Sequence, residues 1–348
     1  MSPFRVLTRA RRAVSTLGST MRPDGFHGAH ERAGFFEGWY VKVVSGDRAA
    51  RIAVIPGIFV GLEDSGGRHD EAFVQVLDGS TGRSWYERYN PADFHAATGH
   101  FDVAIGPNRF DSRGMTLDLP ESGLRGRVDF TTTFDPWPVT VRSPGIMGWY
   151  AWLPVMECYH GVASFGHDLA GSLSLGGVSM PFDGGRGYLE KDWGRAFPSG
   201  YIWMQSNHFA IPGLCLVASI AVIPWHRTEF RGFIVGLRMP GPDGQPVLHR
   251  FATYTGGRTT ALTVDDDHVC WSLRSKAGLT LDITAERRRG GLLHAPVRTQ
   301  MHRRVEETLD ARIHVRLTDR DGRLILSDCG QVAGLEVHGD IDGLLAMT

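Results

Sequence analysis

Acidic and aromatic residues are concentrated in a short stretch near the middle of the chain. In an extended strand, side chains alternate between two faces, so Tyr188, Glu190 and Asp192 lie together while Lys191 and Trp193 lie opposite. Two carboxyl groups on one face repel each other, which favours the neutral, protonated form of one of them. The spacing therefore predicts a pair of acids suited to proton-transfer chemistry.

The next stretch continues this mixture of aromatic and polar side chains. Tyr201, Trp203, Gln205, Asn207 and Phe209 lie on one face of an extended strand. Such a face is typical neither of a core nor of a solvent surface, and it favours the wall of an apolar pocket with a few fixed polar groups. The alternative is a sheet face at the contact between two barrels, where buried amides satisfy each other.

A third cluster lies in the first part of the chain. Glu37 and Trp39 share one face of a predicted strand, and Tyr40 and Lys42 share the other. A carboxylate beside a core tryptophan is either exposed at the end of the strand or buried for a chemical purpose, and both interpretations remain open.

A single histidine lies in a further strand-like stretch. Glu157 and Tyr159 share one face of it, and Cys158 and His160 share the other. A lone histidine in such a strand is commonly a hydrogen-bonded core residue. With acids elsewhere in the chain, however, it remains a candidate for acid–base catalysis.

These clusters must be positioned by short strands, and the pattern along the rest of the chain predicts such strands. From Phe35 onward, runs of β-branched and aromatic residues alternate with Gly, Asp and Pro, which are typical of turns. The runs 39–43 and 51–55, separated by Ser-Gly-Asp, predict a hairpin. Long helical periodicity is scarce, so the sequence predicts an all-β protein.

A weak internal repeat predicts that one β unit occurs twice. Each copy is about 160 residues long, the size of a lipocalin-like barrel that holds one small ligand. We place the junction in the Gly-rich segment Asp183–Gly187 and expect a basic N-terminal segment (residues 1–30), a first barrel (residues 31–185) and a second barrel (residues 186–348). The matching segments are Trp39 with Trp203, Ala53–Ile55 with Ala221–Ile223, and Phe73–Leu77 with Phe233–Leu237.

Composition limits the classes of function. The 348 residues carry 37 Lys and Arg against 38 Asp and Glu, and a net charge of −1 argues against nucleic acid as a partner. The 4 cysteines form no CxxC pair, which argues against a zinc ribbon and fits a reducing cytoplasm. The N-terminal segment lacks the continuous apolar core of a secretory signal. Its arginines and apolar side chains predict either peripheral membrane contact or a helix that caps a barrel.

The ordered motifs resemble the tocopherol cyclase family. They are Phe-Phe-Glu-Gly-Trp-Tyr at residues 35–40, Glu-Lys-Asp-Trp-Gly at 190–194 followed by Phe-Pro, and Tyr-Ile-Trp-Met-Gln-Ser-Asn-His-Phe at 201–209. The resemblance implies two lipocalin-like antiparallel β-barrels in tandem, in agreement with the repeat. Asp192 and Ser206 stand where the plant enzymes have Asn and Cys, which makes the chain more similar to bacterial members.

The resemblance also implies a reaction, the closure of a chroman ring from a prenylated hydroquinone. A protonated carboxyl group must give a proton to the alkene, aromatic faces must stabilise the resulting cation, and an acceptor must take the phenolic proton. No metal and no cofactor are needed. If Lys191 pairs with an acid on a neighbouring strand, that acid is a poor proton donor. The expected proton donor is Glu190 or Asp192, of which Glu190 is favoured, and Glu37 is the second choice. His160 or Tyr159 would accept or orient the phenol. The wall would consist of Trp39, Tyr40, Trp193 and Trp203, and Gln205 and Asn207 would hold the ring hydroxyls.

Three other functions remain open from the sequence. A non-catalytic barrel could carry a hydrophobic isoprenoid or quinone, and an enzyme of the same acid-initiated type could act on another isoprenoid, for example by hydration. A metal-dependent enzyme is the third, prompted by His27, His30 and Glu31, although histidines scattered singly along strands argue against it.

Overall fold

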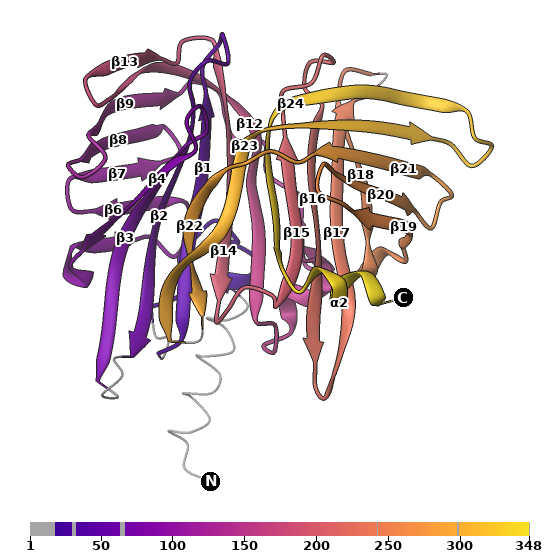
Figure 1. Ribbon diagram of the computed structural model, residues 1–348, viewed down its shortest axis with the longest axis horizontal. Coiled ribbons are helices and arrows are strands. Elements are labelled where there is room, and N and C mark those ends of the chain that lie inside the picture. The colour runs from indigo at the N-terminus through magenta and orange to yellow at the C-terminus, as the bar shows by residue number, and fades with distance from the viewer. Residues whose placement is uncertain (1–17, 30–32, 63–66, 242, 298, 348) are drawn as a thin grey trace.

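Two large antiparallel sheets, each curved around its own core, make up the computed structural model (Figure 1). The structure describes residues 18–29, 33–62, 67–241, 243–297 and 299–347. The nearly all-β architecture confirms the predicted fold class. No described helix is long and apolar enough to cross a membrane.

The first sheet has the strand order β4-β3-β2-β1-β14-β12-β9-β8-β7-β6-β5, with β13 paired to β12. Its strands are β1 (Phe35–Val44), β2 (Arg51–Leu62), β3 (Arg68–Asp78), β4 (Arg83–Tyr89), β5 (Phe94–Ala96), β6 (Asp102–Ile105), β7 (Asn108–Asp111), β8 (Gly114–Leu119), β9 (Leu124–Phe130), β12 (Cys158–Leu175), β13 (Val178–Pro181) and β14 (Gly185–Gly194).

The second sheet has the order β18-β17-β16-β15-β24-β23-β21-β20-β19, with β22 paired to β23. Its strands are β15 (Gly200–Ser206), β16 (Cys215–Trp225), β17 (Thr228–Pro240), β18 (Pro246–Ala252), β19 (Arg258–Val264), β20 (His268–Arg274), β21 (Thr280–Glu286), β22 (Gly291–Val297), β23 (Gln300–Thr318) and β24 (Leu324–Gly339). Short elements complete the fold: β10 (Val139–Thr140), β11 (Ser143–Pro144), η1 (Pro91–Asp93), η2 (Gly148–Trp152), η3 (Thr253–Thr255) and α2 (Ile341–Ala346).

The two sheets repeat one topology. In each, four consecutive strands form one end of the sheet, and the last strand returns to pair with the first: β14 with β1, and β24 with β15. Within the described residues, no strand pairing closes either sheet at its ends, and the arrangement is consistent with a tandem lipocalin-like fold. The predicted repeat is therefore visible in the order of strands. Its alignment of Trp39 with Trp203 is wrong in detail, because Trp39 packs in the first core whereas Trp203 lies between the sheets.

The passage between the sheets lies later than the junction placed at Asp183–Gly187. That segment is the turn into β14, where Gly184 adopts a φ of +68° that favours glycine. Since β14 pairs with β1 and β12, it completes the first sheet, and the chain crosses over at residues 195–199. Here the Gly-rich turn joins β13 to β14, which pair one after the other with β12, and it does not mark a boundary between sheets.

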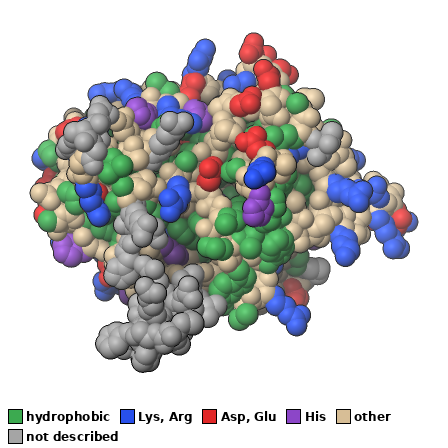
Figure 2. Space-filling view, turned by 90° about the horizontal axis from the view of Figure 1, so that it is seen from below, with side chains coloured by type: hydrophobic (Ala, Val, Ile, Leu, Met, Phe, Trp, Pro, Cys, Tyr) green, Lys and Arg blue, Asp and Glu red, His purple; other side chains and the backbone are tan. Residues whose placement is uncertain are grey.

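Alternation along the strands creates three apolar layers. Trp39 and Val41 face the core inside the first sheet, and Ile202 and Met204 face the core inside the second. The opposite faces meet in a third layer between the sheets, which contains Tyr40. Hydrophobic side chains also gather on the lower face of the molecule (Figure 2). The membrane contact predicted for the N-terminal segment falls mainly on residues 1–17, outside the described residues.

Candidate active site

A cavity of about 190 Å³ lies between the two sheets. Both sheets contribute to its wall, which combines an apolar surface with a few polar groups, as is typical of binding sites for small molecules. Its aromatic residues are Phe36, Tyr40, Phe73, Tyr150, Phe197, Tyr201, Trp203, Phe230 and Phe233, and its titratable residues are Cys158, His160, Glu190, Asp192, His294, Glu307 and Glu336 in addition to the tyrosines.

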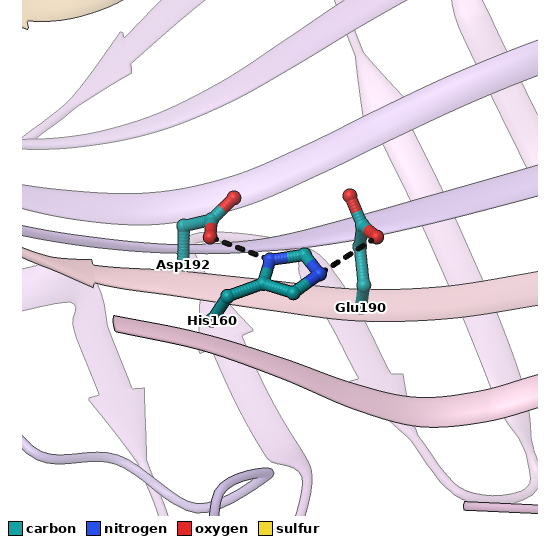
Figure 3. Close-up of side chains that lie close together, drawn as sticks. All are labelled: His160, Glu190 and Asp192. Atoms are coloured by element: carbon teal, nitrogen blue, oxygen red, sulfur yellow. Dashed lines mark hydrogen bonds and ion pairs between the residues drawn. The ribbon is translucent and has the colours of Figure 1, made fainter. Parts of the chain in front are cut away.

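His160 on β12 lies between Glu190 and Asp192 on β14 (Figure 3). Its Nδ1 is 2.8 Å from Asp192 Oδ1, and its Nε2 is 3.3 Å from Glu190 Oε2. The register explains this contact, because His160 pairs with Asp192 and Glu190 lies two residues away on the same face. Burial alone lowers the pKa of His160, but the charges of Asp192 and Glu190 outweigh it and raise the pKa to about 10. His160 is therefore an imidazolium at neutral pH.

Glu190 is surrounded by hydrogen donors. The Tyr188 hydroxyl donates to its Oε2 at 2.6 Å, and Trp203 Nε1–H donates to the same oxygen at 3.3 Å. The His160 imidazolium faces this oxygen as well. These contacts favour an acceptor role for Glu190 over the donor role expected from the sequence, because donors already point at its carboxylate.

Glu307 on β23 and Glu336 on β24 form a second acidic group that the sequence motifs do not contain. The two residues are register partners on adjacent strands, so their side chains lie on the same face. The Tyr40 hydroxyl donates to Glu307, and the Tyr201 hydroxyl donates to Glu336 at 2.6 Å. We call these two acids the carboxyl pair.

Both members of the carboxyl pair bind protons more strongly than ordinary carboxyl groups. Burial and the charge of Glu336 raise the pKa of Glu307 well above its usual value. Burial raises the pKa of Glu336 to about 8, opposed by the Tyr201 hydrogen bond and assisted by the charges of Asp192 and Glu190. Glu307 Oε2 is buried with no donor among the described residues. A proton shared within the pair would satisfy this oxygen.

The sequence contains a signal that could have identified Glu307. Val305, Glu307 and Leu309 alternate along β23, and all three are buried. An acid in the middle of an apolar alternation indicates a buried carboxyl group. Glu307 lies far along the chain from the motifs at residues 190–209, so the sequence did not indicate that it packs beside them.

Glu37 lies outside the cavity, on the opposite face of β1. Lys191 Nζ is 2.5 Å from Glu37 Oε1, and the backbone N–H of His27 donates to both carboxylate oxygens at 2.9 and 3.0 Å. Burial raises the pKa of Glu37, but Lys191 and His27 outweigh it and the pKa is lowered. Glu37 is thus a buried carboxylate in an ion pair, which removes the reason for choosing it as a proton donor.

The residues around this ion pair also lie away from the cavity. Lys191 Nζ is 4.8 Å from the ring centre of Trp39 and 4.7 Å from that of Trp193, so the ammonium group is held between two aromatic faces. Tyr159 stacks on Trp193 at 5.5 Å between ring centres, and its hydroxyl donates to the Leu153 carbonyl. Trp39 and Trp193 therefore do not form the cavity wall expected from the sequence, and Tyr159, expected to accept or orient the phenol, does not line the cavity.

The two amides are buried between the sheets but do not line the cavity. Asn207 Nδ2 donates to the carbonyls of Phe165 at 3.1 Å and Gly187 at 2.9 Å, which links β15 to the first sheet. Gln205 Nε2 lies 3.9 Å from Cys215 Sγ. Their surroundings match the alternative of a contact surface between two β units. Of the expected site residues, the structure brings Glu190, Asp192, His160, Tyr40 and Trp203 together around the cavity.

One group of described residues offers ligand atoms for a metal ion. The ligand atoms of His160, Glu190 and Asp192 all lie within 4.8 Å of one another. They contact each other directly, and both imidazole nitrogens face a carboxylate oxygen, so an ion would have to displace these contacts. His30 and Glu31, which prompted the metal alternative, lie outside the described residues.

Comparison with known proteins agrees with the resemblance found in the motifs. A probable chloroplastic tocopherol cyclase of Oryza sativa subsp. japonica is 31% identical over 72 residues, which cover 21% of this chain and 15% of that protein. The matched segment is therefore a small part of the rice protein.

One solved structure supports the fold at low sequence identity, and a second gives a lower TM-score. The crystal structure of CghA with Sch210972 superposes with a TM-score of 0.55 over 88% of each chain at 12% identity. Kievitone hydratase from Nectria haematococca covers 92% of each chain at 12% identity with a TM-score of 0.46. The sequence model of the tocopherol cyclase-like family matches residues 127–339, more than half of the chain, although the motif at residues 35–40 lies outside that range. The chain belongs to the tocopherol cyclase-like family.

Proposed function

We propose that this protein is an acid-initiated cyclase that closes a chroman ring on a prenylated hydroquinone. The observation that carries the proposal is the carboxyl pair, Glu307 with Glu336, in an aromatic cavity between the sheets. Its raised pKa values keep a proton on the pair at neutral pH, as protonation of an alkene requires. A simple carrier of hydrophobic molecules would need no such pair.

The carboxyl pair would start the reaction. It gives its proton to the less substituted carbon of the alkene nearest the ring, so that a C–H bond forms, the C=C π bond breaks and a tertiary carbocation remains. Tyr40 and Trp203, whose ring centres are 5.4 Å apart, provide aromatic faces beside the pair. Such faces stabilise a cation by up to about 2 kcal/mol each when water is excluded.

Ring closure and loss of the phenolic proton complete the reaction. The phenol oxygen adds to the cation and forms the new C–O bond, while the Glu190 carboxylate accepts the phenolic proton. His160 and Asp192 keep Glu190 oriented toward the cavity. Proton exchange between Glu190 and the carboxyl pair restores the starting state, so no oxidant or reductant is consumed.

Turnover of a prenylated hydroquinone in D₂O tests this mechanism. We expect a product of unchanged connectivity apart from the new ring, with a single deuterium on the ring carbon that accepted the proton. Glu307→Gln and Glu336→Gln should each reduce kcat by about a hundredfold or more. A matched control is Glu87→Gln, a buried acid outside the cavity that accepts two hydrogen bonds from Ser122.

Four results would contradict the proposal. A product without deuterium would exclude protonation by an exchangeable acid, and full activity in both pair variants would exclude the carboxyl pair. A product heavier by one water would identify a hydratase instead. Binding without any change in the ligand would identify a carrier.

A further inference from the structure

The cavity has two ends, and the acidic groups lie between them. On the first sheet, Glu190 pairs with Tyr40 on β1. The register of β1 with β2 places Tyr40 beside Ile55, which pairs with Gln75 on β3. All four side chains line the cavity. Neighbouring strands are about 4.8 Å apart, so this row extends roughly 14 Å from Glu190 to what we call the Gln75 end.

A second row of side chains crosses the other sheet. Next to the carboxyl pair, Trp203 pairs with Glu336, and Ser219 on β16 pairs with Trp203. These residues also line the cavity, and we call the far side of this row the Ser219 end. The other side chains that β16 and β17 contribute to the wall are apolar: Ala221, Ile223, Phe230, Phe233 and Ile234. The Ser219 end therefore suits a hydrocarbon chain.

His294 lies at the Gln75 end, on β22, which packs against β3 and β4 of the first sheet. Gln75 Nε2 donates to the His294 carbonyl at 3.0 Å, and the His294 backbone N–H donates to Gln75 Oε1 at 2.7 Å. The imidazole stacks on Tyr86 with 4.1 Å between ring centres, and the Tyr86 hydroxyl donates to Glu71 at 2.6 Å. The position of the His294 ring is therefore fixed from two sides.

An irregularity in the strand pairing exposes His294 to the cavity. The register of β22 with β23 shifts between Leu293 and His294, and both of these consecutive residues line the cavity. In a regular strand, consecutive side chains point to opposite faces. Shifts of this kind often redirect a side chain beside an active site.

The His294 ring is available for a ligand. Within the described part of the chain, the hydrogen bonds of His294 are made by its backbone and none by its ring nitrogens. Burial and the charges of Arg88, Arg303 and His302 lower the pKa of His294 against the opposing charge of Glu71, so the ring is neutral at pH 7. A neutral imidazole has one N–H donor and one acceptor nitrogen, so it can hydrogen-bond a hydroxyl group in either direction.

We propose that His294 binds the second hydroxyl group of the hydroquinone, the one that does not enter the new ring, and that Gln75 is the positioning residue that holds His294 there. This inference rests on the proposed function. The reacting hydroxyl must lie near Glu190 and the alkene near the carboxyl pair, so the opposite hydroxyl points along the first row toward the Gln75 end. The prenyl tail then follows the second row to the Ser219 end.

The length of the first row agrees with this orientation, because roughly 14 Å accommodates a six-membered ring with a hydrogen bond of about 2.8 Å at each end. The reverse orientation would place the ring at the Ser219 end. It is less favoured, because the rest of the wall on β16 and β17 is apolar and would leave a polar ring with few partners.

Binding of two unreactive ligands tests the role of His294 in the full chain. One is a hydroquinone with a saturated alkyl tail, and the other is the matching phenol, which lacks the second hydroxyl. By titration calorimetry, the unchanged protein should bind the hydroquinone about tenfold more tightly than the phenol. His294→Phe keeps a ring to stack on Tyr86, so it should lose this preference while its affinity for the phenol stays the same. His294→Gln, which retains a donor and an acceptor, should recover part of the preference.

Two further variants serve as controls. His249→Phe replaces a half-buried histidine on β18 that does not line the cavity, and it should bind both ligands as the unchanged protein does. Ser219→Ala should keep the preference for the hydroquinone, because both ligands carry the same tail. Unchanged affinity of His294→Phe for the phenol shows that the variant is folded. A preference that survives in His294→Phe, or that is lost in Ser219→Ala instead, would overturn the proposal.

Gln75→Leu separates positioning from contact. It removes both hydrogen bonds to the His294 backbone, so the preference should fall although the imidazole is still present. Gln75→Glu keeps the acceptor for the His294 N–H and should retain more of the preference than Gln75→Leu. Equal preference in Gln75→Leu and the unchanged protein would contradict the positioning role.

Turnover of the corresponding unsaturated compounds separates this inference from the proposed function. His294→Phe should reduce kcat/KM for the hydroquinone about tenfold and leave kcat/KM for the phenol unchanged. Selective binding that depends on His294, without turnover of either compound, would contradict the proposed function and leave the hydroxyl site intact. Turnover of both compounds with equal kcat/KM in the unchanged protein would contradict the hydroxyl site alone.

Discussion

The titratable side chains of the cavity form two groups. Glu190 and Asp192 contact the His160 imidazolium. The carboxyl pair accepts hydrogen bonds from the hydroxyls of Tyr40 and Tyr201, while burial and neighbouring carboxylates raise the pKa values of both its members. A protonated carboxyl pair near a hydrogen-bonded carboxylate provides the general acid and the general base that one site requires.

Removal of the Tyr201 hydroxyl should move the pH dependence of catalysis. This hydroxyl stabilises the Glu336 carboxylate, so Tyr201→Phe should raise the pKa of Glu336 further above about 8. Activity that requires the protonated pair is lost as pH rises through this pKa. The alkaline limb of the kcat/KM profile of Tyr201→Phe should therefore lie at higher pH than that of the unchanged protein.

Tyr86→Phe is the control for this measurement. Tyr86 donates to Glu71 at 2.6 Å, the same distance as in the Tyr201–Glu336 pair, but neither residue lines the cavity. Its profile should match that of the unchanged protein. A Tyr201→Phe profile that does not move, or that moves to lower pH, would argue against the carboxyl pair as the proton donor.

At the scale of elements, β1 and β14 each serve two environments. Their paired register places Tyr40 beside Glu190 on the cavity side and Trp39 beside Lys191 on the side of the first core. Because successive side chains point in opposite directions, adjacent residues of one motif have unrelated tasks. The Glu37–Lys191 ion pair stabilises the core side, while the cavity side carries the acid–base groups.

Lys191→Met should therefore destabilise the fold without altering the chemistry of the folded protein. It leaves the Glu37 carboxylate buried without its cation, which costs about 3–5 kcal/mol in free energy of unfolding. Glu37→Gln in the same chain removes that charge, so the double variant should be more stable than Lys191→Met alone. Denaturant unfolding gives these free energies, and kcat per folded molecule should stay unchanged. If fully folded Glu37→Gln lost a large part of its kcat, Glu37 would again be a candidate catalytic residue.

At the scale of the whole molecule, the cavity exists only because two sheets pack against each other. Glu190 and His160 come from the first sheet, and Glu307 and Glu336 come from the second. The packing is close at the turn after β3, where a methyl group built on Gly79 would lie 2.4 Å from Leu309 Cβ on β23. Only glycine allows this approach of the two sheets.

Gly79→Val should separate the sheets locally and weaken the site. Overpacking at such a contact costs about 1–3 kcal/mol, so the melting temperature and the affinity for a hydroquinone ligand should both fall. Gly99→Val is the control, because a methyl group there would meet only Arg22 at 3.6 Å. Unchanged melting and ligand affinity in Gly79→Val would mean that this contact does not position the cavity.

The sequence alone determined what depends on local alternation. The period of two placed Tyr188, Glu190 and Asp192 on one face and Lys191 on the other, and it predicted short strands throughout. The sequence also predicted that any acid paired with Lys191 would be a poor proton donor. These conclusions follow from backbone geometry within one strand and need no knowledge of neighbours.

The tertiary structure alone decided which faces meet. Glu307 accepts a hydrogen bond from Tyr40 across a sequence separation of 267 residues. Because β14 returns to pair with β1, the chain passes between the sheets later than the Gly-rich segment Asp183–Gly187 predicted. Trp39 and Trp203 look equivalent in sequence, but the strand register directs one into a core and the other into the cavity. Cross-strand register and sheet packing depend on the sum of many non-local contacts, which no single stretch of residues encodes.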